Sequence, residues 1–149
     1  MFHVKHWSDY MQDYMDIAYE CAKKATKKGD IPVGAVIVYK NKIIAKAFNN
    51  RHSLNNVLGH AEIIAINKAQ KKLKTWHLNA CEMYVTLEPC DMCKAVILES
   101  RLKKVYFLVE KTDQKINFSK KNATKIEKLH RNYSEKYSSL LSDFFSNKR

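Results

Sequence analysis

The chain has 149 residues, a length that suits one domain with a sizeable hydrophobic core. Hydrophobic residues make up 46% of the sequence, and only 3 Gly and 2 Pro occur, which argues against long disordered segments. No stretch approaches the roughly 20 apolar residues of a membrane span, and the N-terminus lacks the apolar run of a signal peptide. We therefore expect a single domain over residues 1–149, in the cytoplasm and without a membrane partner.

Helical and strand patterns follow one another along the chain. Helical spacing of apolar residues predicts four helices, over residues 11–25, 60–72, 91–100 and 135–146. Apolar runs bounded by turn residues predict four strands, over residues 33–39, 42–48, 82–87 and 103–109. Residues 124–129 allow either a fifth strand or the start of a helix. This α/β order predicts one sheet with helices on both faces.

The net charge is +12 and is unevenly distributed. Residues 100–149 carry 13 Lys or Arg against 5 Asp or Glu, whereas residues 1–99 carry 14 against 10. A basic C-terminal third suggests an anionic partner, and nucleic acid is the usual one. Because only 4 of the 27 basic residues are Arg, a general lysine bias would give the same charge. Charge alone therefore leaves RNA contact open.

Two segments at predicted helix starts carry metal-ligand chemistry. His60 opens one helix in GHAEIIAI, and Cys90 and Cys93 open the next in EPCDMC. Cysteines three residues apart share one face of a helical turn, so both thiolates can bind one ion. Two Cys and one His leave a fourth zinc position for water, which is the catalytic rather than the structural pattern. Cysteines without a secretory signal also favour metal or catalysis over disulfides.

Glu62, two residues after His60, favours catalysis, because activated water needs a base to take its proton. A structural zinc site with Cys81 or His77 as a fourth ligand is one alternative. A thioredoxin-like dithiol is another, but it leaves the histidine and the glutamate without a role. The complete pattern, H-x-E followed by P-C-x-x-C, is the signature of zinc nucleobase deaminases.

With these motifs the chain resembles the bacterial tRNA adenosine deaminase family, within the cytidine-deaminase-like fold. The resemblance rests on DIPVGAVIV, FNN, GHAEIIAI, MYVTLEPCDMC and SRLKKVYF, and on LLSDFF near the C-terminus. The central motifs are shared with guanine, cytosine and nucleotide deaminases, whereas LSDFF is more particular to the tRNA enzymes. The resemblance implies a three-layer α/β/α domain with a five-stranded mixed sheet. It also implies a homodimer that converts adenosine to inosine at the wobble position of a tRNA anticodon stem-loop.

Residue roles follow from the same resemblance. One Zn2+ per chain would be bound by His60, Cys90 and Cys93. Glu62 would move protons between water, the purine and the leaving amine. Asn49, in the matching FN motif, would hydrogen-bond the base, and Val33 would line the pocket.

The segment after the fourth predicted strand departs from the family pattern. The family usually reads Phe-Gly-Ala with an Asp soon after, whereas this chain has Leu108 at the first Gly and Lys111 where the Asp would be. In the family this region approaches the nucleotides beside the target. The departure motivates an alternative function, deamination of a free base or nucleoside such as guanine or cytosine. A third hypothesis is a non-catalytic RNA-binding partner that keeps zinc for stability.

The C-terminal residues are predicted to contact RNA. Lys148 and Arg149 follow Phe144 and Phe145, and such a basic rim beside an aromatic helix suits phosphate contact. We expect one of the two phenylalanines to pack in the core and the other to lie near RNA.

Overall fold

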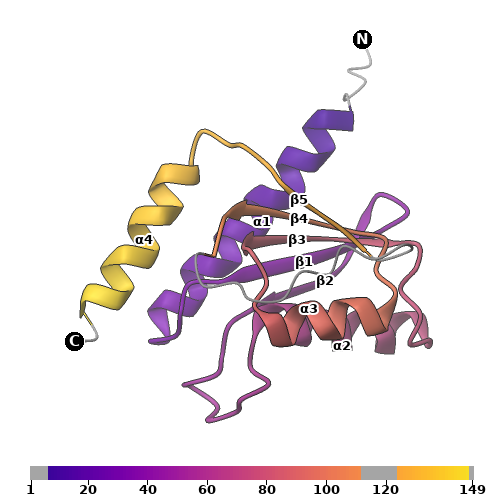
Figure 1. Ribbon diagram of the computed structural model, residues 1–149, viewed down its shortest axis with the longest axis horizontal. Coiled ribbons are helices and arrows are strands. Elements are labelled where there is room, and N and C mark those ends of the chain that lie inside the picture. Colours follow the sequence, from indigo (N-terminus) through magenta and orange to yellow (C-terminus); the bar gives the residue numbers. More distant parts are fainter. Residues whose placement is uncertain (1–6, 112–123, 148–149) are drawn as a thin grey trace.

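The computed structural model describes residues 7–111 and 124–147. Five strands form one mixed sheet in the order β2-β1-β3-β4-β5, with helices on both faces (Figure 1). The helices are α1 (Trp7–Lys27), α2 (Ala61–Leu73), α3 (Asp91–Ser100) and α4 (Ser134–Asn147). The strands are β1 (Gly34–Tyr39), β2 (Lys42–Phe48), β3 (Cys81–Leu87), β4 (Lys104–Val109) and β5 (Lys125–Lys128). The predicted α/β/α layers are confirmed, and the segment left open as strand or helix forms β5.

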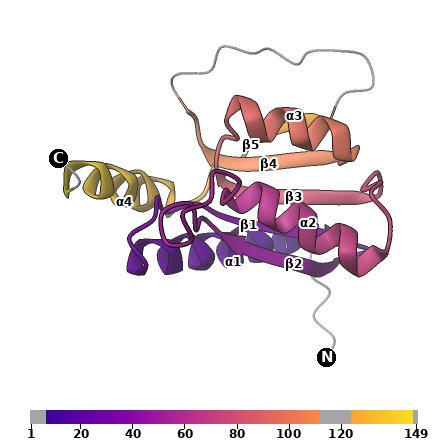
Figure 2. The same cartoon turned by 90° about the horizontal axis from the view of Figure 1, so that it is seen from below.

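Strand directions place the starts of α2 and α3 at the same end of the strands. β1 pairs antiparallel with β2 and β3, whereas β3, β4 and β5 run parallel. Phe48 at the end of β2 pairs with Gly34, and Val85 near the end of β3 pairs with Ala35. Because α2 follows β2 and α3 follows β3, both helices begin at this end of the strands (Figure 2).

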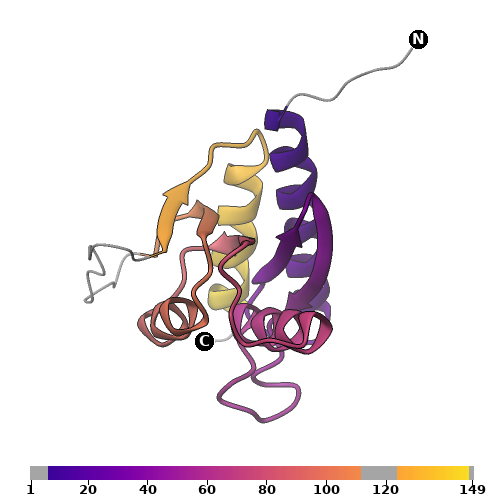
Figure 3. The same ribbon diagram turned by 90° about the vertical axis from the view of Figure 1, so that its right-hand side faces the viewer.

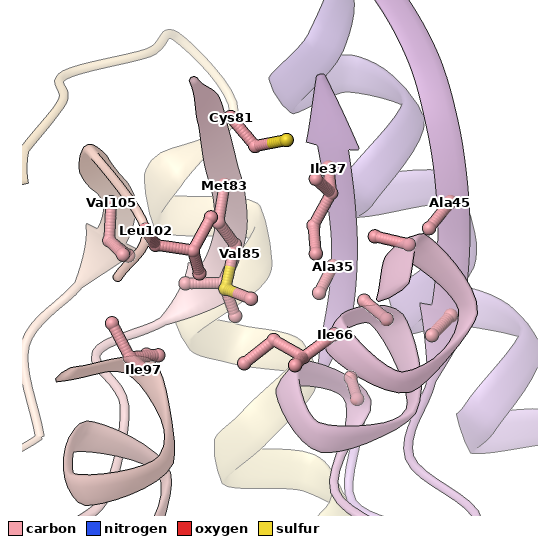
Figure 4. Close-up of a cluster of buried hydrophobic side chains, with 14 of the residues drawn as sticks. Ala35, Ile37, Ala45, Ile66, Cys81, Met83, Val85, Ile97, Leu102 and Val105 are labelled. Atoms are coloured by element: carbon pink, nitrogen blue, oxygen red, sulfur yellow. The ribbon is translucent and has the colours of Figure 1, made fainter. Parts of the chain in front are cut away.

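Each face of the sheet covers its own hydrophobic cluster. Beneath α2 and α3 the cluster is mainly aliphatic and includes Ile37, Ile66, Met83, Val85 and Ile97 (Figure 4). Beneath α1 it is rich in tyrosine and includes Tyr14, Tyr84 and Tyr106. Burial on both faces explains why these strands read as continuous apolar runs rather than alternating ones. No helix in the described part of the chain has the length and apolar character needed to span a bilayer.

α1 and α4 are both held close to the start of β1. A Cβ atom at Gly34 would overlap the Ala18 carbonyl oxygen and lie 2.6 Å from the Ala22 amide nitrogen, so α1 packs on β1 at backbone distance. The buried Tyr137 of α4 donates its hydroxyl to the Pro32 carbonyl oxygen at 2.7 Å. The C-terminal helix is thereby anchored beside the end of the sheet's strands at which α2 and α3 begin.

Candidate metal centre and active site

The starts of α2 and α3 bring the three predicted ligands together. His60 and Cys90 immediately precede their helices, and Cys93 lies in the first turn of α3. The His60 Nδ1 atom lies 3.6 Å from Cys90 Sγ and 3.4 Å from Cys93 Sγ. Sulfur and nitrogen ligands of one tetrahedral zinc ion would lie about 3.5 Å apart, given bonds of about 2.3 and 2.0–2.1 Å. The donor set and its spacing therefore fit one zinc ion.

Local electrostatics favour a thiolate in this group. Cys90 precedes α3, and the positive end of a helix dipole stabilises an anion placed there. Hydrogen bonding from the Cys93 thiol, with help from His60, lowers the pKa of Cys90 to about 3. The same pairing with Cys90, together with burial, raises the pKa of the Cys93 thiol. Zinc binding would favour the thiolate form of both cysteines and so release protons.

Glu62 lies in the first turn of α2, with 4% of its surface exposed. Burial raises the pKa of its carboxyl above the ordinary value, and the negative charge of Cys90 acts in the same direction. A carboxyl with a raised pKa can accept and return a proton near neutral pH. The geometry therefore places a candidate acid–base group next to the candidate metal ligands.

The alternative fourth ligands lie at the other end of β3. Cys81 begins this strand and pairs with Tyr39 at the end of β1, and His77 lies in the preceding loop. The seven residues of β3, about 20 Å of extended chain, separate Cys81 from the turn that carries Cys90. Among the described residues, the group able to hold a metal consists of one histidine and two cysteines. All four cysteines are free, so Cys90 and Cys93 form no disulfide.

Hydrogen bonds tie the predicted base-binding residues to the start of α2. The Asn49 N–H donates to the Val33 carbonyl oxygen at 3.0 Å, and Asn49 Oδ1 accepts the Ala61 N–H at 3.1 Å. Both Asn49 and Val33 are buried. Asn49 therefore caps a backbone N–H of α2, and its two amide hydrogens are the groups it could offer to a base.

Comparison with known proteins agrees with this geometry. The family model for the cytidine and deoxycytidylate deaminase zinc-binding region matches residues 8–109. A tRNA-specific adenosine deaminase from Buchnera aphidicola subsp. Schizaphis graminum is 40% identical over 145 residues, which cover 91% of this chain and 94% of that protein. The chain belongs to the tRNA-specific adenosine deaminase family of zinc-binding deaminases. The expected zinc dependence and fold family are thereby confirmed.

Two further comparisons show how far the likeness extends. A tRNA-specific adenosine deaminase from Aquifex aeolicus is 46% identical over 94 residues, or 63% of this chain and 62% of that protein. This chain thus spans less than two thirds of that relative's length. A solved structure from a study of A-to-I editing by tRNA:A34 deaminases has a TM-score of 0.74 at 29% identity. The match covers 80% of this chain and 98% of the solved one.

An ion pair that was not among the predicted site residues brackets the two cysteines. The Lys94 ammonium group donates to Glu88 Oε2 at 3.2 Å, and the two side chains are only 9% and 17% exposed. Glu88 Oε1 accepts the Lys111 N–H at 3.1 Å, and the Glu88 N–H donates to the Val109 carbonyl oxygen at 2.9 Å. The pair closes the CxxC turn and joins it to the chain after β4. The sequence signal for this ion pair is an acidic residue two positions before the first cysteine of the CxxC motif and a lysine directly after the second.

The residues that depart from the family pattern have separate structural roles. Leu108 is fully buried in the cluster beneath α1, so its side chain fills core. The backbone N–H of Lys111 contacts the site by donating a hydrogen bond to the Glu88 carboxylate. The residues that follow this segment, 112–123, lie outside the described residues, as do Lys148 and Arg149. Of the two phenylalanines of α4, Phe145 is exposed and Phe144 is partly buried.

Proposed function

We propose that the protein hydrolyses adenosine to inosine at the wobble position of a tRNA anticodon and releases ammonia. One juxtaposition carries this proposal: a His60–Cys90–Cys93 group with buried Glu62 beside it. A purely structural zinc site has no use for a buried carboxyl at this point. The choice of tRNA adenosine as substrate is supported by the family to which the chain belongs.

We assign proton transfer to Glu62. Zinc held by His60, Cys90 and Cys93 would lower the pKa of water towards about 7 and make it nucleophilic near neutral pH. Glu62 takes a proton from the attacking water and delivers it to the purine N1, which makes C6 more electrophilic. It then takes the proton of the new C6 hydroxyl and passes it to the amino group, which leaves C6 as ammonia. Water is consumed, ammonia is released, and the carboxyl returns to its starting state.

We assign base binding to Asn49 and Val33. Because Asn49 Oδ1 already accepts the Ala61 N–H, the amide hydrogens are left to donate to the base. Val33 is joined to Asn49 by a backbone hydrogen bond and offers an apolar wall beside it. An anticodon base already lies in a loop, so turning it out costs less than extracting it from a duplex.

We further propose that residues 1–149 act as one deaminase domain in a cytoplasmic homodimer. The loop before His60 supports the dimer, because Leu54, Val57 and Leu58 are between 52% and 65% exposed next to the site. A cluster of exposed apolar side chains beside a functional site suits coverage by another subunit. Sedimentation equilibrium tests this, and a monomer at micromolar concentrations would contradict it.

The decisive experiment compares substrates of different size. Zinc-loaded protein is incubated with an anticodon stem-loop and, separately, with guanine, cytosine and adenosine. Inosine at the first anticodon position supports the proposal. Rapid deamination of a free base with the stem-loop untouched would establish the alternative function. Binding of tRNA without inosine would indicate a non-catalytic partner, and Glu62→Ala controls for contaminating deaminases.

A further inference from the structure

The described part of the chain concentrates positive charge at the end opposite to the metal centre. Three segments at that end, each a turn with the adjoining ends of its helices or strands, are here called the basic end: residues 39–42, 71–80 and 101–104. Together they carry eight Lys or Arg and no Asp or Glu. The segments around the metal centre are residues 30–33, 49–60, 88–93 and 110–111. These carry two basic and four acidic residues.

Strand pairing and loop hydrogen bonds assemble the basic end. Tyr39 at the end of β1 pairs with Cys81 at the start of β3. The Lys103 N–H donates to the Cys81 carbonyl oxygen at 3.0 Å, and the Leu78 N–H donates to the Ser100 carbonyl oxygen at 2.8 Å. Figure 3 shows the same end of the molecule, with the last turns of α2 and α3 towards the viewer. The eight cations therefore belong to one surface although they come from three parts of the chain.

Most of these cations face solvent. Seven of the eight side chains are exposed: Lys40, Lys42, Lys71, Lys72, Lys74, Arg101 and Lys103. The eighth, Lys104, lies 3.2 Å from Glu127 of β5. Although Glu127 pairs with Lys104 and Glu99 is exposed in the last turn of α3, the three segments themselves carry no Asp or Glu. A cluster of exposed cations of this kind is the electrostatic footprint of a nucleic-acid contact.

An exposed aromatic pair lies within the basic end. Trp76 is 53% exposed and stacks on His77, with ring centroids 3.6 Å apart. The Gln70 side chain donates to the Trp76 carbonyl oxygen at 3.0 Å, which holds the backbone of the loop. Aromatic faces next to lysines are what proteins use to stack on bases while binding phosphates.

Helix electrostatics explain only part of this surface. Lys71, Lys72, Lys74 and Arg101 lie at the C-terminal ends of α2 and α3, where cations offset the negative end of the helix dipole. That effect does not require the hairpin lysines between β1 and β2. It also does not require an exposed tryptophan.

We infer that the basic end is a second RNA-binding surface, which holds tRNA phosphates outside the anticodon stem-loop while Trp76 provides a stacking face. The inference rests on the proposed tRNA substrate. The length of β3, about 20 Å, separates this surface from the metal centre. In this proposal the phosphates held there lie beyond the anticodon stem-loop, so the basic end adds affinity for whole tRNA that an isolated stem-loop does not receive.

A matched pair of double variants tests the inference. Lys72→Glu/Lys74→Glu reverses two charges at the basic end. Lys46→Glu/Lys68→Glu makes the same net-charge change at two exposed lysines on β2 and α2. Fluorescence anisotropy measures the Kd of each variant for a tRNA transcript and for its anticodon stem-loop over a range of KCl concentrations. Zinc content and Tm verify that each variant is folded.

The expected result is specific to whole tRNA. Lys72→Glu/Lys74→Glu raises the tRNA Kd about tenfold and lowers the slope of log affinity against log salt by about one to two. Its stem-loop Kd and its turnover of saturating stem-loop stay at the wild-type values. An unchanged tRNA Kd overturns the inference. An equal loss of affinity in Lys46→Glu/Lys68→Glu also overturns it, because net charge would then explain the effect.

Trp76 provides a second, uncharged test. Trp76→Ala should weaken tRNA binding about tenfold, and Trp76→Phe should restore most of it, because phenylalanine keeps a stacking face. Equal Kd values for Trp76→Ala and the wild type contradict the stacking role. Binding is measured independently of inosine formation. A wild-type protein that makes no inosine but needs Lys72 and Lys74 for tRNA would refute the proposed function and leave this inference standing.

Discussion

The two ends of α2 and α3 carry opposite chemistry. At their starts, His60 and Cys90 have extended backbone and hold the metal-ligand atoms. At their ends, Lys74 and Arg101 adopt left-handed backbone, with φ of 56° and 64°, and present cations. Thiolates at the positive end of a helix and cations at the negative end are both favoured by the helix dipole. One electrostatic rule thus separates the reaction site from the basic end.

Two cysteines show how strongly the pKa of a thiol differs between the two ends. Burial at the start of β3 raises the pKa of Cys81 to about 11. Hydrogen bonding from the Cys93 thiol and from His60 lowers the pKa of Cys90, just beyond the end of the same strand, to about 3. The residue type is the same, and the position along β3 decides whether it is a packing group or a ligand.

The largest expected effect is loss of zinc from the metal centre. Cys90→Ala should lower the metal content from one zinc per chain to near zero and abolish deamination, because it removes one of three protein ligands. Cys81→Ala, at the opposite end, should keep the zinc. Metal analysis after dialysis measures both. Retained zinc in Cys90→Ala, or lost zinc in Cys81→Ala, would contradict the assigned ligand set.

The next largest effect concerns catalysis with the metal in place. Glu62→Gln should lower kcat/KM on the stem-loop by about 10²–10⁴-fold, because the side chain keeps its shape but no longer accepts a proton. Zinc content should remain at the wild-type value. Glu82→Gln, a change of the same type near the start of β3, should leave the rate unchanged. Near-normal turnover by a zinc-loaded Glu62→Gln variant would mean that another group moves the proton.

Local motifs made much of the site end predictable. The spacing of Cys90 and Cys93 fixes them on one helical turn, and the short H-x-E motif places Glu62 beside His60. Apolar runs predicted the strands, because both faces of the sheet are buried. Each of these inferences needs only residues that are close in sequence.

Contacts between distant segments could not be predicted in this way. Tyr137 donates to a carbonyl 105 residues earlier, and nothing near either residue signals the bond. The basic end was also missed, because counting charge along the chain assigned the surplus to the C-terminal third. Folding instead collects cations from three separate turns. Sheet topology decides such groupings, and it is not contained in a local pattern.

Two ion pairs, one at each end, differ in burial and should therefore differ in their contribution to stability. Lys94–Glu88 at the metal centre and Lys104–Glu127 near the basic end have the same N···O distance, 3.2 Å. The first pair is mostly buried, and Glu127 of the second is 57% exposed. Lys94→Met should cost about 3 kcal/mol of stability because it leaves Glu88 buried without its cation. Lys104→Met should cost less than about 1 kcal/mol.

Thermal unfolding of the zinc-loaded variants measures this difference. Lys94→Met should also release zinc faster to a chelator, because the Glu88 contacts hold the turn that carries both cysteines. Equal Tm values for the two lysine variants would show that burial does not distinguish the pairs. A destabilised Lys94→Met variant that releases zinc at the wild-type rate would restrict the buried pair to a role in folding.

The smallest expected effect separates the two roles of Asn49 at the site end. Asn49→Asp keeps an oxygen for the Ala61 N–H but removes the amide hydrogens assigned to the base. It should keep the contact with the Ala61 N–H while kcat/KM on the stem-loop falls about tenfold, as expected for one lost hydrogen bond of about 1.5 kcal/mol. Asn49→Ala should lose that rate and, in addition, about 1 kcal/mol of stability, because the start of α2 loses its cap. Wild-type kcat/KM in Asn49→Asp would leave Asn49 as a cap alone, and base recognition would then have to come from another residue at this end of the sheet.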